Sequence, residues 1–280
     1  MVAGGAAEVG PTPAPPADDT DGVDAVQRTS GENVRPAAPV ESSGLAAPVT
    51  GATAGTVPRG VAVDPRRRSE GASRLLNVVL ALLLLLVALP LFALVALAVR
   101  LSSRGPVFYT QLRVGLDRRA RDGRATLDRR AEDYGGRPFT IYKFRSMYVD
   151  AEPDGRAVWA RPDDPRVTPV GRVLRAARLD ELPQLFNVLK GDMNLVGPRP
   201  ERPSIVMELR EHIAEYAARH RVKPGLTGLA QVNRAYDATI EDVRQKVHYD
   251  LEYVRRQGLW KDLVILAKTV PVVLFRRGGW

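Results

Sequence analysis

The longest apolar run of the chain extends from Val78 to Val99, 22 residues without a charged side chain. At about 1.5 Å per residue a helix of this length measures about 33 Å, enough to cross a hydrocarbon core of about 30 Å. Two observations favour a different path. Arginines flank both ends of the run, which would keep both ends on the cytoplasmic side, and Pro90 divides it into two pieces too short to span. These residues leave a spanning helix and a re-entrant hairpin as equal alternatives.

Alternating apolar and polar positions predict strands after this run. One strand or hairpin lies within Gly105 to Gly115, and another strand covers Phe139 to Phe144 and ends at Arg145. Helical spacing of apolar residues predicts helices over residues 170–178, 179–190, 203–220, 240–255 and 259–275. The segment Val222 to Gln231 is punctuated by Pro and Gly and predicts a loop with at most a short strand. The expected fold class is α+β, mostly helical, with a small β element.

The last of these helices combines apolar and basic side chains. Trp260, Leu263 and Phe275 alternate with Lys261 and Lys268, a mixture typical of an amphipathic helix that lies in a membrane interface. An ordinary core helix is the alternative. We prefer the interfacial helix because of the apolar run at residues 78–99.

Two segments lack an apolar pattern. Residues 1–72 contain none of the aromatic residues but nine of the 22 prolines, so we expect a disordered N-terminal tail and no signal peptide. Residues 118–137 are strongly charged, and we expect an inserted loop over about 116–135. The expected organisation is therefore a tail over residues 1–72, a membrane helix over 73–104 and a folded domain over 105–280.

Composition removes several classes of chemistry. The chain has no cysteine and three scattered histidines, which excludes disulfides and thiol catalysis and argues against a His-based zinc centre or triad. The net charge is +9, and residues 73–280 carry +12. A basic surface usually faces phosphate in nucleic acid, anionic lipid or a phosphorylated substrate. Arginine codons of a GC-rich genome explain the bias equally well, so charge alone does not decide the partner.

The adjacent carboxylates Asp180 and Glu181 are the strongest candidates for chemistry. They open a predicted helix, where acidic residues commonly act as N-caps, so a structural role is one interpretation. Their surroundings favour another, because arginines precede them and the Gly- and Pro-rich segment Gly191 to Pro200 presents Arg199. A carboxylate can attack phosphorus when cations neutralise the repulsion between two anions, and its neighbour can bind Mg²⁺. Lys143 and Arg145 at a strand end suit a diphosphate, although a solvated strand end explains them as well.

Three segments, in this order, resemble the bacterial sugar transferases, which are monotopic polyprenyl-phosphate phosphoglycosyltransferases of exopolysaccharide and glycan assembly. They are KFRSM (Lys143 to Met147), LDELPQLFNVLKGDMNLVGPRPERP (Leu179 to Pro203) and VKPGLTGLAQV (Val222 to Val232). The resemblance covers nearly everything from Arg74 to Trp280. It implies a re-entrant membrane helix and a catalytic domain on the cytoplasmic face of the cell membrane, and it resolves the two alternatives at Pro90.

The resemblance also implies a reaction. A sugar 1-phosphate moves from a UDP-sugar to a polyprenyl (undecaprenyl or decaprenyl) phosphate, and UMP is released. In the family the Asp of the DE pair forms a covalent phosphosugar intermediate and the Glu binds Mg²⁺, which assigns these roles to Asp180 and Glu181. Substrate phosphates would be held by Lys143, Arg145, Arg175 and Arg199. Expected partners are the UDP-sugar, with glucose or galactose as the leading sugars, the polyprenyl phosphate and membrane lipid, without nucleic acid; self-association stays open.

The chain departs from the family pattern near the membrane. Asn77 stands where an Asp often opens the membrane helix, and Leu89 precedes Pro90 where a small polar residue is common. Neither difference touches the DE, KFRSM or GPRP positions. We therefore expect an intact catalytic site.

Two other classes of protein would explain part of the sequence. A glycosyltransferase that moves only the sugar would release UDP, and a basic membrane-anchored binding protein would release no nucleotide. The binding protein accounts for the charge and the apolar run, but it leaves the Gly and Pro spacing after Asp180 unexplained. We expect the phosphoglycosyltransferase.

Overall fold

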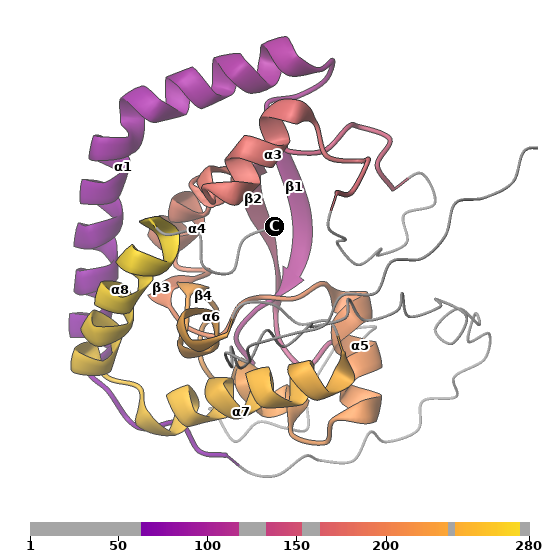
Figure 1. Cartoon of the computed structure of the whole chain (residues 1–280). Helices are drawn as coiled ribbons and strands as arrows, with labels where there is room; N and C mark the ends of the chain where they lie inside the picture. Colours follow the sequence, from indigo (N-terminus) through magenta and orange to yellow (C-terminus); the bar gives the residue numbers. More distant parts are fainter. Residues whose placement is uncertain (1–62, 118–132, 153–162, 235–238, 275–280) are drawn as a thin grey trace, which may run out of the picture. The chain divides into compact units, whose positions relative to one another are not determined.

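A computed structural model describes residues 63–117, 133–152, 163–234 and 239–274. Most of the expected tail and most of the charged insertion lie outside these residues, as does Phe275. The mostly helical α+β class is confirmed (Figure 1). The elements are α1 (Glu70–Ser102), β1 (Phe108–Val114), β2 (Pro138–Phe144), α3 (Pro169–Ala176), the 3₁₀ turn η2 (Leu179–Glu181), α4 (Gln184–Lys190), β3 (Asn194–Val196), α5 (Pro203–His212), the 3₁₀ segment η3 (Tyr216–Arg221), β4 (Gly225–Thr227), α6 (Leu229–Asn233), α7 (Ile240–Arg256) and α8 (Leu259–Leu274).

Helix α1 is long and apolar enough, by length and composition, to cross a membrane. It begins at the N-cap Ser69, whose hydroxyl accepts a hydrogen bond from the Ala72 amide, and it contains Pro90. Figure 1 shows two straight arms of α1 that meet at a marked bend. Because a proline removes a helical hydrogen bond and crowds the preceding turn, Pro90 accounts for the bend. The helix continues through Pro90, so this residue kinks α1 but does not divide it into two separate helices.

Both arms of α1 are attached to the rest of the folded unit. In the first arm the Arg74 guanidinium donates to the carbonyls of Val188 and Leu189, and the Asn77 side chain accepts from the Leu195 amide. In the second arm Val95 and Val99 pack with Phe144 and Leu174 in a small apolar cluster. Asn77, the departure noted above, therefore anchors the first arm to β3.

Most of the remaining α1 surface is exposed and apolar. Its exposed large side chains are Leu75, Val79, Leu82, Leu83, Leu84, Leu86, Val87, Leu89, Leu94, Leu97 and Leu101. Helix α8 adds Leu259, Trp260, Leu263, Val270 and Val273, and Trp260 is 77% exposed. A soluble surface rarely carries so large a contiguous apolar area, so these two helices are suited to an apolar environment.

Strands β1 and β2 confirm the two predicted strands. They pair antiparallel from Phe108 opposite Phe144 to Val114 opposite Pro138. The described ends of the charged insertion meet at the base of this pair, where the Gly115 amide donates to the Arg137 carbonyl and the Arg137 amide to Leu116. The pair places Lys143 and Arg145 at the end of β2, next to η2.

A second, parallel pair joins β3 to β4, and the sequence patterns did not predict β3. Asn194 lies opposite Gly225 and Val196 opposite Thr227. Beyond β3 the backbone of Gly197 approaches that of Gly225 so closely that a Cβ on Gly225 would lie 2.0 Å from the Gly197 nitrogen. This close approach requires glycine and brings the Arg199 segment against the turn after η3.

Two helical predictions and one loop prediction need correction. Residues 179–190 form η2 and then α4, because Pro183 interrupts the first turn. Residues 203–220 form α5 and η3, because the chain leaves the helical conformation at Ile213. Residues 222–231 contain β4, the short strand that the loop prediction allowed, but also the start of α6, which it did not. Helices α3, α7 and α8 match their predicted ranges to within about two residues over the described chain.

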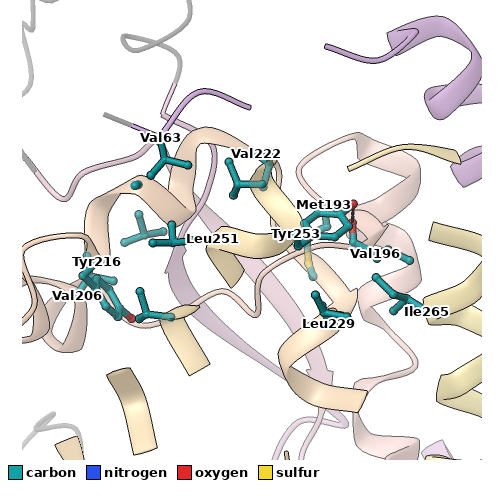
Figure 2. Packing of buried hydrophobic residues seen from close by; sticks show 14 of the residues in the cluster. Val63, Met193, Val196, Val206, Tyr216, Val222, Leu229, Leu251, Tyr253 and Ile265 are labelled. Carbon is teal, nitrogen blue, oxygen red and sulfur yellow. Dashed lines mark hydrogen bonds between the residues drawn. The ribbon is translucent and has the colours of Figure 1, made fainter. Parts of the chain in front are cut away.

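The main core joins the C-terminal helices to the short strands. Figure 2 shows Val196 of β3, Leu229 of α6, Leu251 and Tyr253 of α7 and Ile265 of α8 among its members. Val63 also lies in this cluster, 3% exposed, so the folded unit already includes residues within the range expected as a tail.

Residues 63–69, here called the N-terminal strap, run along η3, α7 and α8. The Arg221 guanidinium donates to the Val63 carbonyl, and the Arg66 amide donates to Val254. Arg68 forms an ion pair with Asp262 at 3.1 Å. The strap leads directly into α1 and fixes where that helix begins.

Candidate active site

Asp180 and Glu181 lie in η2, between α3 and α4, and face the end of β2. Arg178, two residues before Asp180, has φ 55°, a left-handed conformation that is uncommon for residues other than glycine. This turn separates the carboxylates from α3. Neither of them acts as a cap, since Arg178 holds the N-cap position of η2 and Pro183 that of α4. The N-cap interpretation of Asp180 is therefore wrong.

Glu181 is the centre of a charged cluster. Its carboxylate lies 3.2 Å from Nζ of Lys143 on β2, and its Oε2 accepts a hydrogen bond of 3.0 Å from Nη1 of Arg199. A second Arg199 nitrogen contacts Oε1. Burial opposes ionisation of Glu181, but Arg199 and Lys143 outweigh it and hold the pKa of this carboxyl well below its usual range. Glu181 is therefore a carboxylate at any physiological pH.

Asp180 has a different environment. It is 7% exposed, and in the described part of the chain its carboxylate accepts no hydrogen bond and forms no ion pair within 4 Å. Burial raises its pKa, against the field of Lys143. A buried carboxyl group without a partner costs stability, and such groups are concentrated at functional sites. Asp180 is the chemically available member of the pair.

The loop that presents Arg199 is held by hydrogen bonds to the carbonyls of three successive residues. Nη2 of Arg219 donates to the Arg199 carbonyl at 2.9 Å, and Nη1 of Arg113 donates to the Pro200 carbonyl at 3.2 Å. The Val114 amide donates to the Glu201 carbonyl at 2.9 Å. Arg199 therefore has a fixed backbone, while its guanidinium reaches Glu181.

The donors to this loop are themselves ion-paired. Arg219 lies 2.7 Å from Asp250, and the two side chains are 1% and 2% exposed. Glu201 pairs with Lys246 at 3.1 Å and with Arg113 at 3.3 Å, and these cations outweigh burial to lower the Glu201 pKa to about 2. Sequence reasoning missed these supporting residues. Glu201 directly follows the GPRP motif, which was an available signal, but Arg219 and Asp250 lie in unrelated segments and carry none.

The structure brings together four of the six predicted site residues. Lys143 and Arg199 contact Glu181 directly, and Asp180 is its neighbour. Arg175 lies at the end of α3, where its charge acts on Asp180 without an ion pair between them within 4 Å. Arg145 points elsewhere, because its guanidinium donates to the carbonyls of Val99, Ser103 and Arg104 at the end of α1. It stabilises the C-terminus of α1 rather than the carboxylate cluster.

The donor set fits one mode of Mg²⁺ binding. The described residues contain no group of three or more His, Cys, Asp and Glu side chains placed to hold a metal ion. Mg²⁺, however, is commonly bound through one or two carboxylates, with water and substrate phosphates completing its shell. The adjacent carboxylates Asp180 and Glu181 meet that requirement only together with a phosphorylated substrate.

The model of a known family, described as bacterial sugar transferase, matches residues 68–276. The chain belongs to this family. The transferase is 45% identical over 222 residues to a UDP-glucose:undecaprenyl-phosphate glucose-1-phosphate transferase of Caulobacter vibrioides, covering 79% of this chain and 73% of that relative. It is 43% identical to the enzyme of the same description in Escherichia coli K12, covering 72% of this chain and 40% of that relative.

A third relative has a different sugar in its description. The transferase is 43% identical over 192 residues to an undecaprenyl-phosphate N-acetylgalactosaminephosphotransferase of Aeromonas hydrophila, covering 67% of this chain and 41% of that relative. The chain thus spans about two fifths of the length of two of these relatives. Similar identity to glucose and N-acetylgalactosamine enzymes means that family membership does not select the sugar.

Proposed function

We propose that the transferase moves a sugar 1-phosphate from a UDP-sugar to a polyprenyl phosphate, undecaprenyl or decaprenyl, and releases UMP. The relatives described above, which act on undecaprenyl phosphate, support the substrate class. The observation that carries the mechanism is the buried, unpaired carboxylate of Asp180 beside an ion-paired Glu181. In such an arrangement one carboxylate is free to react while the other organises the cations.

In the first half of the proposed reaction, one oxygen of Asp180 attacks the phosphorus that bears the sugar. The bond from this phosphorus to the bridging oxygen breaks, and UMP leaves with that oxygen. In the second half, a phosphate oxygen of the lipid attacks the same phosphorus. The bond to Asp180 then breaks, which regenerates the carboxylate and leaves a diphosphate-linked lipid sugar.

The cations of the site hold and neutralise the phosphates. Lys143 and Arg199, now ion-paired with Glu181, favour the ionised form of Asp180 and suit the diphosphate of the donor. Arg175 adds a more distant charge. We assign Mg²⁺ to Glu181, where it would neutralise charge on the diphosphate. Arg145 is left out of this assignment because of its place at the end of α1.

The attachment of both arms of α1 supports a membrane arrangement. Arg74 and Asn77 attach the first arm to α4 and β3, and Arg145 binds the end of the second arm. A helix whose two ends bind one folded unit enters and leaves a bilayer on the same face. We therefore propose a re-entrant helix, with the site on the cytoplasmic face, at the first membrane step of glycan assembly.

The test separates the two half-reactions. Enzyme in nanodiscs given a UDP-sugar without the polyprenyl phosphate acceptor should release about one UMP per active site and gain the mass of one sugar phosphate.

Asp180→Asn keeps the size of the side chain but lacks the anion, so it should fold and show no adduct. Glu181→Gln should be strongly impaired, with partial recovery at high Mg²⁺. Release of UDP, or an adduct on Asp180→Asn, would overturn the mechanism.

A further inference from the structure

A cavity of about 400 Å³ lies between β2 and α4, outside the charged cluster. It is lined by Tyr142 of β2 and by Phe186, Leu189 and Lys190 of α4. Phe186 is 42% exposed, although phenylalanine side chains are usually buried. The walls are therefore mainly apolar, with one cation at the rim.

The cavity lies beside the proposed membrane helix. The ring of Phe186 meets the ring of Phe92 on α1 edge to face, with centroids 6.0 Å apart. At the other end of α4, the Arg74 guanidinium of the first α1 arm binds the carbonyls of Val188 and Leu189. Helix α4 thus contacts both arms of α1, and Phe186, which lines the cavity, touches the helix that we place in lipid.

The same two elements lead to the reacting groups. Lys143 follows Tyr142 on β2, so its side chain leaves the opposite face of the strand and lies 3.2 Å from Glu181. Helix α4, which lines the cavity with Phe186, begins three residues after Glu181. Helix α4 has seven residues and is about 10 Å long at about 1.5 Å per residue. A ligand with a phosphate near Asp180 would therefore reach the cavity with the first part of an extended chain.

The charge at the rim of the cavity indicates whether the cavity suits a hydrocarbon chain or a second phosphate. Nζ of Lys190 lies 3.3 Å from the Tyr142 hydroxyl and 3.7 Å from the Asp192 carboxylate. It also sits 5.2 Å from the centre of the Tyr142 ring. Because Asp192 balances this cation at the carbonyl end of α4, the rim is a poor site for an anionic headgroup.

We propose that this cavity binds the hydrocarbon chain of the lipid phosphate acceptor, with its first units packed against Phe186 and Leu189. This inference rests on the proposed function and adds a subsite to it. The acceptor phosphate would then lie at the Asp180 end of α4 and its chain at the Lys190 end. Apolar contact with the chain selects a long lipid over a soluble phosphate.

The experiment measures the two half-reactions of full-length protein in nanodiscs. Phe186→Ala should leave adduct formation from the UDP-sugar alone within about twofold of wild type, because no lipid takes part. Transfer to a long-chain polyprenyl phosphate should show a KM raised about tenfold, because apolar contact with the chain is lost. Phe186→Leu should restore most of the affinity. Leu263→Ala on α8, where Leu263 is 43% exposed, is the matched control and should leave both halves unchanged.

A second probe varies the acceptor. Wild type should prefer a long-chain polyprenyl phosphate over a two-isoprene phosphate, and Phe186→Ala should lose this preference. A normal KM for the long chain, an equal loss of both half-reactions, or an effect that follows only the anionic phospholipid content of the disc would each overturn the proposal. Absence of any adduct in wild type would instead overturn the proposed function, so the two failures are distinguishable.

Discussion

His220 in η3 is a buried histidine that the proposed mechanism does not use. It is 5% exposed, and burial, together with the nearby cations Arg219 and Arg210, lowers its pKa to about 3. Its usual pKa is 6.5. At a pH between these two pKa values, His220 binds a proton in the unfolded chain but not in the folded protein. Stability from this group is therefore complete above the unfolded pKa and is lost as the pH falls toward the folded pKa.

We predict that His220→Gln makes the protein less sensitive to acid. The wild type should lose up to about 1.4 kcal/mol of unfolding free energy per pH unit below pH 6.5 from this histidine alone. The variant lacks that contribution, so the two thermal midpoints should converge as the pH falls from 7 to 4.5. A constant difference across this range would show that His220 binds its proton equally in the folded and unfolded states, which would contradict the lowered pKa.

At the residue scale, the residues of the proposed site were easier to predict from the sequence than the residues that hold them in place. Motif and charge identified Asp180, Glu181, Lys143 and Arg199, which the structure places together. The pair Arg219 and Asp250 could not be predicted, because burial of one charge beside another depends on tertiary contacts and leaves no local pattern. Arg145 lies in a motif of basic residues, yet its direction depends on where α1 ends.

At the scale of elements, Arg145 joins β2 to the end of α1. The last carbonyls of a helix lack intrahelical partners, and a guanidinium can satisfy several of them at once. Its nitrogens lie 2.8 Å from the Ser103 carbonyl and 3.4 Å from that of Val99, with a third bond to Arg104. The residue is 5% exposed, so water does not replace these bonds.

Arg145→Met should therefore weaken the attachment of α1 without removing the reacting groups. We expect a loss of about 2 kcal/mol in stability, seen as a lower thermal midpoint, with adduct formation per folded molecule retained. Lys143→Met is the informative comparison and should slow adduct formation more than it lowers the midpoint. A normal midpoint with a raised KM for UDP-sugar would instead restore Arg145 to the phosphate-binding set.

Elements with a strong periodicity of apolar residues were predictable from the sequence, and elements that depend on the close approach of two distant backbones were not. The apolar spacing of α7 and the alternation of β2 gave correct ranges. Strand β3 has three residues, and its pairing with β4 depends on glycines that let two distant backbones meet. The helix predicted over residues 203–220 ended early because Ile213 turns into the core, where it is 3% exposed.

At the scale of the whole molecule, the attachment of both α1 arms to one folded unit supports the proposed membrane topology. Gly71 lies at the start of α1 with open space around its Cα, and Glu211 is exposed on α5. The chain has no cysteine of its own. Single cysteines at these two positions therefore report the side of the membrane on which each lies.

We predict the same labelling pattern for Gly71→Cys and Glu211→Cys. An impermeant thiol reagent should label neither in intact cells and both after permeabilisation, because the proposed re-entrant helix would keep both on the cytoplasmic face. Labelling of Gly71→Cys alone in intact cells would demonstrate a spanning helix. Activity of each variant should be measured first, as a control for correct insertion.

The ion pair between Arg68 and Asp262 connects residues that are 194 positions apart in the chain. During synthesis, the strap and the membrane helix emerge long before α8. Contacts between residues so distant in sequence are slow to form, because a long loop must close first. We therefore predict that α1 inserts into the membrane before the strap closes, so that the nascent chain is anchored to the bilayer before its folded unit is complete. A ribosome-stalled product that ends before Leu259 should accordingly be inserted and still open to protease.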